Sequence, residues 1–172
     1  MEYPKNEITI RIAQLAEGLH EYHFLPEASE IGLEDNFQQP VRIDATLEKD
    51  AQQLYLKTSV HAGGIFCCDR CTDEFKRELT NEYAMIYVYN ELDAAKFEED
   101  EVHVIDIHAP SIDLTEDVRD VVTLAIPLKM LCKENCKGLC PQCGVNRNHQ
   151  TCSHNDEAVD SRWDGLKKLI NN

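Results

Sequence analysis

The distribution of cysteines constrains this chain more than any other feature, because five of its eight cysteines lie between residues 132 and 152. They are Cys132, Cys136, Cys140, Cys143 and Cys152. Residues 140–144 read Cys-Pro-Gln-Cys-Gly, a turn in which Pro fixes φ on entry and Gly tolerates positive φ on exit, so the two thiolates converge on one point. The stretch has too few apolar residues to order itself by burial, so we expect bound metal to supply the missing folding energy.

The location expected for the chain follows from what its sequence lacks. It has no run of about 18 apolar residues, so we expect no membrane-spanning segment. Its first residues, Met1-Glu-Tyr-Pro-Lys, show no basic start followed by an apolar block, so we expect no secretory signal. These patterns predict a cytoplasmic protein, and in a reducing compartment eight cysteines favour metal binding over disulfides.

The candidate metal ligands form four pairs, which suits two structural zinc ions with four ligands each. The pairs are Cys68–Cys71, Cys132–Cys136, Cys140–Cys143 and Cys152–His154. Cys67 and His149 are left over. Because ligands are abundant, we expect closed coordination and a structural role; a catalytic zinc would keep one position open.

Spacing alone leaves three partitions of these ligands open. The local partition joins Cys68, Cys71, Cys132 and Cys136 in one site and Cys140, Cys143, Cys152 and His154 in a compact knuckle. A second partition groups Cys136, Cys140, Cys143 and Cys152, and a third joins the two Cys-x-x-Cys turns as in a zinc ribbon. Only the local partition uses every pair.

The remaining pattern predicts an α+β fold with an antiparallel β-rich domain. Apolar and polar residues alternate at 8–12, 41–47 and 54–60, and a short charged connector makes the last two a hairpin. Residues 75–89 are also β-rich, with Tyr83, Met85, Tyr87 and Tyr89 on one face, where we expect core packing rather than an RNA-stacking platform. Gly63-Gly64 is expected to break the pattern or to mark a bulge or turn.

Two helices are expected after these strands. The first covers about 113–126, starting with an Asp113 cap and Glu116 three residues later and ending before Pro127. The second is a short C-terminal helix beginning near Asp160 or Ser161. The predicted organisation is therefore a β-rich domain at 1–130 and a Cys-rich zinc-binding tail with its terminal helix at 131–172, packed on the first part. Residues 91–101, with six acidic side chains and one Lys, are expected to be a mobile surface loop.

Charge limits the contacts that this chain can make with nucleic acid. The net charge of −15 opposes non-specific RNA binding and favours basic protein partners. The region from residue 129 to residue 154 is locally basic, and its candidates for RNA contact are Lys129, Lys133, Lys137 and Arg147. Two zinc ions with seven thiolates would cancel most of this positive charge, so the same residues can also serve to offset the thiolates.

Four motifs resemble those of the YceD family, the large ribosomal RNA subunit accumulation proteins of bacteria and plastids. They are Cys68-Asp-Arg-Cys71 with Phe75, Ile112-Asp-Leu114 with the segment to Leu124-Ala-Ile-Pro127, Cys136-Lys-Gly-Leu-Cys-Pro-Gln-Cys-Gly144 with Asn146 and Asn148, and the tail from Cys152 to Arg162. The resemblance spans about residues 40–170. Some relatives have Cys-x-Cys in place of Cys152-Ser-His154, and others have two histidines near the positions of Cys132 and Cys136, which supports the local partition.

The resemblance implies a role in processing or accumulation of large-subunit ribosomal RNA, without an established catalytic activity. The sequence itself shows no nucleophile motif, phosphate loop or distinctive carboxylate pair, so we expect no enzyme and no small-molecule substrate. The expected partners are large-subunit ribosomal RNA or ribosomal assembly proteins. Two alternatives are a zinc-containing protein adaptor unrelated to RNA and a thiol-based redox sensor using Cys67 or Cys71.

Overall fold

A computed structural model describes residues 8–154 of the chain. It divides into two compact units. Unit 1 comprises Met1–Phe66 and Glu74–Met130, and unit 2 comprises Cys67–Asp73 and Leu131–Asn172. The terminal helix predicted near Asp160 lies outside the described residues. Neither described helix has the length or the apolar composition needed to cross a lipid bilayer.

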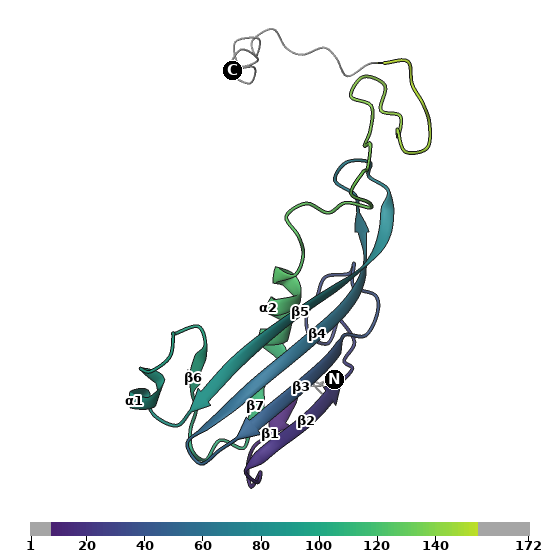
Figure 1. The fold of residues 1–172 in the computed structure, drawn as a ribbon. Helices are drawn as coiled ribbons and strands as arrows, with labels where there is room; N and C mark the ends of the chain where they lie inside the picture. Colours follow the sequence, from purple (N-terminus) through teal and green to yellow (C-terminus); the bar gives the residue numbers. More distant parts are fainter. Residues whose placement is uncertain (1–7, 155–172) are drawn as a thin grey trace, which may run out of the picture. The chain divides into compact units, whose positions relative to one another are not determined.

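Unit 1 contains a five-stranded sheet in the order β2-β3-β4-β5-β6 (Figure 1). Its strands are β2 (Gly18–Phe24), β3 (Arg42–Lys49), β4 (Gln53–Cys67), β5 (Glu74–Val88) and β6 (Val102–Val104). The predicted hairpin is confirmed, since β3 and β4 pair antiparallel with Leu47 opposite Leu56. β6 instead pairs parallel with β5, so the sheet departs from the purely antiparallel pattern that the sequence predicts at this edge.

One apolar core fills unit 1 and accounts for the alternation in its strands. Ile43, Leu47, Leu54, Leu56 and Val60 are fully buried on one face of the sheet. They form a single cluster with residues of the small sheet, which pairs β1 (Thr9–Arg11) with β7 (Ser111–Asp113), and of helix α2 (Thr115–Leu124). The tyrosines of β5 also belong to this cluster or pack against it, so the predicted core packing is confirmed.

Helix α2 starts differently from the predicted capping box. Its N-cap residue is Leu114, which makes no side-chain cap hydrogen bond. The Asp113 carboxylate accepts a hydrogen bond from the Thr115 N–H at 2.9 Å, and the Thr115 hydroxyl accepts one from the Ile8 N–H at 3.2 Å. The polar groups at the helix start thus hydrogen-bond to neighbouring backbone groups. Val118 and Val122 are the buried residues on the apolar face of α2.

Two local expectations need correction. Of the alternatives predicted for Gly63-Gly64, a break of the strand is wrong, because β4 continues through the pair to Cys67. The acidic segment after β5 is not purely a loop, because it contains helix α1 (Glu91–Ala94). The Asn90 side chain caps this helix by accepting the Asp93 N–H at 3.0 Å, and acidic residues in a first helical turn interact favourably with the helix dipole.

Candidate metal centres

Unit 2 has almost no apolar interior. Among its described residues, 67–73 and 131–154, the only buried side chains are those of Cys68, Cys71, Cys136 and Cys140. The hydrophobic core cluster lies entirely in unit 1. Burial of apolar surface therefore does little to order these described residues, so their thiols are the groups whose interactions can do so.

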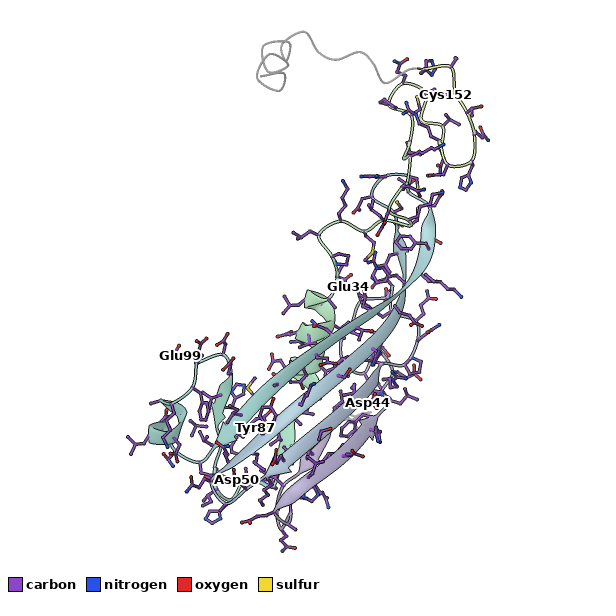
Figure 2. The ribbon with its side chains drawn as sticks, in the orientation of Figure 1. Glu34, Asp44, Asp50, Tyr87, Glu99 and Cys152 are labelled. Atoms are coloured by element: carbon purple, nitrogen blue, oxygen red, sulfur yellow. The ribbon has the colours of Figure 1, made fainter. Side chains whose placement is uncertain are left out.

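The structure gathers the eight predicted ligands into two groups, which are the groups of the local partition. The first group is Cys68, Cys71, Cys132 and Cys136, and the second is Cys140, Cys143, Cys152 and His154. Within each group the ligand atoms all lie within 4.8 Å of one another. Figure 2 shows the yellow sulfur atoms of these loops and labels Cys152.

Sulfur–sulfur distances in the first group fit a tetrahedral metal ion. The Sγ atoms of Cys68 and Cys136 are 3.8 Å apart, and those of Cys71 and Cys132 are 3.7 Å apart. A tetrahedron with metal–sulfur bonds of about 2.3 Å has edges of about 3.8 Å. A disulfide would need about 2.05 Å. The four thiols are thus spaced for a shared cation and too far apart for a bond between them.

The loop between Cys68 and Asp73 is shaped by its own hydrogen bonds. The Thr72 N–H donates to the Cys68 carbonyl at 2.9 Å, and the Cys68 N–H donates to the Asp73 carbonyl at 2.9 Å. Thr72 adopts a left-handed conformation with φ of 61°, unusual for a β-branched residue. This tight turn brings the Cys68 and Cys71 thiols to the same side of the loop.

The electrostatics of the first group favour the binding of a cation. Burial raises the pKa of the Cys68 thiol, but hydrogen bonds from the backbone of Cys132, Arg70 and Cys71 outweigh it and lower that pKa to about 6. Burial, together with the neighbouring sulfurs, raises the pKa of Cys71 to about 12, although a hydrogen bond from the Asp73 backbone lowers it. Four thiolates held this closely are stable together only when a positive ion offsets their charge.

Polar contacts with Asn148 and Arg70 hold Cys136 in position. The Asn148 side-chain N–H donates to the Cys136 sulfur at 3.2 Å, and the Arg70 guanidinium donates to the Cys136 carbonyl at 3.0 Å. Gly138 lies against the backbone of Arg70, where an added Cβ would come within 2.9 Å of the Arg70 carbonyl oxygen, and its φ is 70°. Only glycine fits this close approach, which lets the Leu139 N–H bond that same carbonyl at 2.9 Å.

The second group is built on the Cys-Pro-Gln-Cys-Gly turn. The Gly144 N–H donates to the Cys140 carbonyl and the Cys140 N–H to the Val145 carbonyl, both at 2.8 Å. The Cys140 Sγ and the His154 Nδ1 are 3.8 Å apart. Backbone hydrogen bonds from Cys143 and Gln142 lower the pKa of the Cys140 thiol to about 5, so the turn is prepared to hold a thiolate.

Arg147 is half-buried in this knuckle. Its side chain hydrogen-bonds Cys140 and contributes to the lowered pKa of that thiol. The backbone N–H of Arg147 donates to the Gly138 carbonyl at 3.0 Å. Of the four predicted RNA-contact residues, Arg147 is therefore the one whose charge faces a thiolate, whereas Lys129, Lys133 and Lys137 are exposed.

Asp73 links the loop of residues 67–73 to residues 146–149, a role that sequence reasoning missed. Its carboxylate accepts hydrogen bonds from the Asn146 side-chain N–H at 2.8 Å and from His149 Nε2 at 2.9 Å. Asn146 in turn accepts from the Asn148 side chain at 2.9 Å, and Asn148 contacts the Cys136 sulfur. His149, left over in the sequence, is used here as a partner of Asp73 rather than as a ligand.

We expect Asp73→Ala to weaken metal binding although no ligand is lost. Second-shell partners typically contribute about 10–100-fold to metal affinity, so the affinity of unit 2 should fall by about that factor. Titration of zinc against a competing chelator measures the change. Glu134→Ala, which removes one acidic side chain exposed in the same unit, is the control. Equal titration curves for Asp73→Ala and the unaltered chain would contradict the bridging role.

A protein-family model matches most of the chain. The family model described as large ribosomal RNA subunit accumulation protein YceD matches residues 56–170. A chloroplastic Arabidopsis thaliana protein, named large ribosomal RNA subunit accumulation protein YCED homolog 1, is 36% identical over 58 residues, which cover 34% of this chain and 18% of that protein. No solved structure matches the chain.

Two relatives without an assigned role match over longer stretches. An uncharacterised protein of Mycobacterium tuberculosis is 29% identical over 130 residues, which cover 74% of this chain and 61% of that protein. The uncharacterised Bacillus subtilis protein YlbN is 25% identical over 134 residues, 76% of this chain and 74% of its own length. The matched part of this chain therefore spans about three fifths of the mycobacterial relative.

Proposed function

Because the chain belongs to the YceD family of large ribosomal RNA subunit accumulation proteins, we propose that it acts in biogenesis of the large ribosomal subunit. The observation that carries this proposal is the family match over residues 56–170, which includes all eight clustered metal-ligand candidates. The chain would bind maturing large-subunit ribosomal RNA or ribosomal assembly proteins and support RNA processing or accumulation. This work would take place where ribosomes are assembled, in the cytoplasm.

Two zinc ions are the metals that we propose for the two groups. The donor sets are four thiols in one group and three thiols with one imidazole in the other, both typical of structural zinc. Tetrahedral zinc would supply the folding energy that unit 2 lacks. Side chains of the protein would hold the thiolates in place, Asn148 that of Cys136 and Arg147 that of Cys140. Asp73 would hold residues 67–73 next to residues 146–149.

We further propose that the protein is not an enzyme. Each group offers four protein ligands, so neither would leave an open coordination position for a substrate or a reactive water. The groups that hydrogen-bond to the ligand sulfurs are an asparagine amide, backbone N–H groups and an arginine, and such donors stabilise thiolates. These features support a binding role, with the metal as a structural element.

Lys129, Lys133 and Lys137 are the residues that we propose for RNA contact in this region. All three are exposed, in contrast to the half-buried Arg147. Each can approach a phosphate without breaking a described contact to a thiolate. Because the whole chain carries −15, such contacts must act locally and should weaken steeply with salt.

Sedimentation of a cell lysate tests the proposed function. We expect the tagged chain to co-migrate with precursors of the large ribosomal subunit, and its depletion to lower large-subunit ribosomal RNA relative to small-subunit RNA. Ribonuclease treatment before the gradient serves as the control for migration with RNA. A chain that stays at the top of the gradient, with an unchanged ratio of ribosomal RNAs after depletion, would contradict the proposal and favour a protein adaptor unrelated to RNA.

A further inference from the structure

A groove on unit 1, outside the metal centres, combines cationic and amide side chains. Two adjoining clefts of about 250 and 190 Å³ share Gln39, Gly63 and Glu78 in their walls, so they form one continuous depression. The first cleft also includes Gln38 and Lys76. The second includes Arg42 and His61. We call this depression the β4 groove, because strand β4 forms its floor.

The floor of the β4 groove is backbone because β4 carries two glycines there. A Cβ atom at Gly63 would come within 2.8 Å of the Gln39 side-chain oxygen, so glycine lets that amide reach down to the strand. A Cβ atom at Gly64 would meet the Phe66 ring at 2.9 Å. The Gly63-Gly64 pair, which the sequence marked as a break, thus makes room for the groove while the strand continues.

The charge of the β4 groove is opposite to that of the chain. Its lining contains Arg42, Lys76 and Arg77 against one acid, Glu78, in a chain that carries −15. Arg42 shares its charge with Asp44 at 3.4 Å. The side chain of the exposed Lys76 makes no ion pair or hydrogen bond with any residue that the structure describes. A free ammonium beside a groove in an acidic protein favours a negatively charged ligand.

His61 adds a rigid aromatic surface. Its Nδ1 lies 3.1 Å from the Thr80 hydroxyl and its Nε2 lies 3.3 Å from the Ser59 hydroxyl. With both ring nitrogens engaged, the ring is held in one orientation on the outer face of the sheet. Nucleic acid bases stack on such aromatic rings, and amides such as those of Gln38 and Gln39 bond base edges.

From this combination we propose that the β4 groove binds a short single-stranded segment of RNA. Lys76 and Arg42 contact phosphates, His61 stacks on a base, and the glutamine amides contact base edges. A single-stranded segment can follow this depression along the surface, because its two clefts adjoin and share Gln39, Gly63 and Glu78. The proposal rests on the proposed function, because it takes RNA as the partner, and it places RNA contact on a part of the chain separate from the metal centres.

Binding of a fluorescently labelled single-stranded RNA oligonucleotide to the full, zinc-loaded chain tests this inference by anisotropy. We expect Lys76→Glu to weaken binding by about tenfold and to reduce the slope of log affinity against log salt by about 0.7, the value for one lost phosphate contact. His61→Ala should weaken binding by about tenfold through lost stacking, with a smaller change in salt slope. Unchanged circular dichroism and zinc content confirm that each variant is folded.

Lys57→Glu is the matched control, because it makes the same charge change on the neighbouring strand β4, outside the groove lining, at a residue that pairs with Glu82 at 3.2 Å. Equal weakening by Lys57→Glu and Lys76→Glu would overturn the inference, as would displacement of RNA by an acidic peptide that binds more tightly. If Lys76→Glu and His61→Ala bind RNA normally while Lys133→Glu/Lys137→Glu does not, the groove is wrong but the proposed function stands. If the groove binds RNA and the chain never co-migrates with subunit precursors, the proposed function fails and the groove stands.

Discussion

Cys68→Ser should lose one bound metal ion and most of the order of the loops that the first group connects. Serine is not among the ligands that zinc uses in proteins, so the remaining thiols, Cys71, Cys132 and Cys136, could not complete a closed site. Structural zinc contributes about 10–16 kcal/mol of binding free energy to small metal-dependent folds at neutral pH. Since unit 2 buries no other apolar side chain among its described residues, nothing would replace that contribution.

Native mass spectrometry gives the metal count of this variant, and ¹H–¹⁵N NMR spectra report the order of residues 67–73 and 131–154. Cys67→Ser is a matched control one residue away, since Cys67 is exposed and belongs to neither group. We expect that control to retain two ions and the spectrum of the unaltered chain. A Cys68→Ser protein with two ions, or one whose spectrum matches the control, would show that Cys68 is not a ligand.

Removal of both ions should unfold unit 2 and leave the sheet of unit 1 intact. Unit 1 has its own apolar core, in which Ile43, Leu47, Leu54 and Leu56 are fully buried, whereas cysteines are the only buried side chains among residues 67–73 and 131–154 of unit 2. A strong chelator under reducing conditions should therefore move the NMR signals of residues 131–154 to unfolded positions, while signals from β3 and β4 stay dispersed. Re-addition of zinc should restore the original spectrum.

Magnesium in place of zinc is the control for re-addition, because magnesium prefers oxygen ligands and should not restore unit 2. Loss of all dispersed signals on chelation would show that the core of unit 1 depends on the metal centres. Persistence of the unit 2 signals in metal-free protein would show that the cysteines order these loops without an ion.

The strands of unit 1 were predictable because their periodicity records burial directly. Ile43, Ala45 and Leu47 alternate with outward residues, and the structure buries all three. The helix near 113–126 was predictable for the same reason, through Val118 and Val122. Its cap was not, because Asp113 and Thr115 are used in contacts with backbone groups that sequence spacing does not reveal.

The parallel pairing of the edge strand β6 was not predictable, because the sequence that connects β5 to β6 does not clearly indicate its structure. The acidic segment between β5 and β6 has no apolar face, so nothing in its periodicity indicated a helix. The local signal was the Asn90 cap, which is weak without an apolar pattern behind it. This segment returns the chain to the level of Ile86 before β6 begins, so β6 runs parallel to β5 with Ile86 opposite Val102.

The grouping of the thiols could not be derived from spacing, because three partitions satisfied the ligand arithmetic. The grouping depends on the close approach of Gly138 to the backbone of Arg70 and on the Asp73 carboxylate that holds Asn146 and His149. These contacts link residues far apart in the sequence. Arg147 and His149 show the same limit: each was a plausible charge or ligand in the sequence, whereas in the structure Arg147 hydrogen-bonds Cys140 and His149 contacts Asp73.

The zinc content of the purified, unaltered chain shows whether both ligand groups hold a metal ion. The structure brings eight ligand candidates into two groups of four, and we expect each group to hold one ion. Native mass spectrometry of protein purified under reducing conditions should show two zinc ions per chain. A single ion, no ion, or a mass lower by the hydrogens lost to disulfide bonds would contradict it.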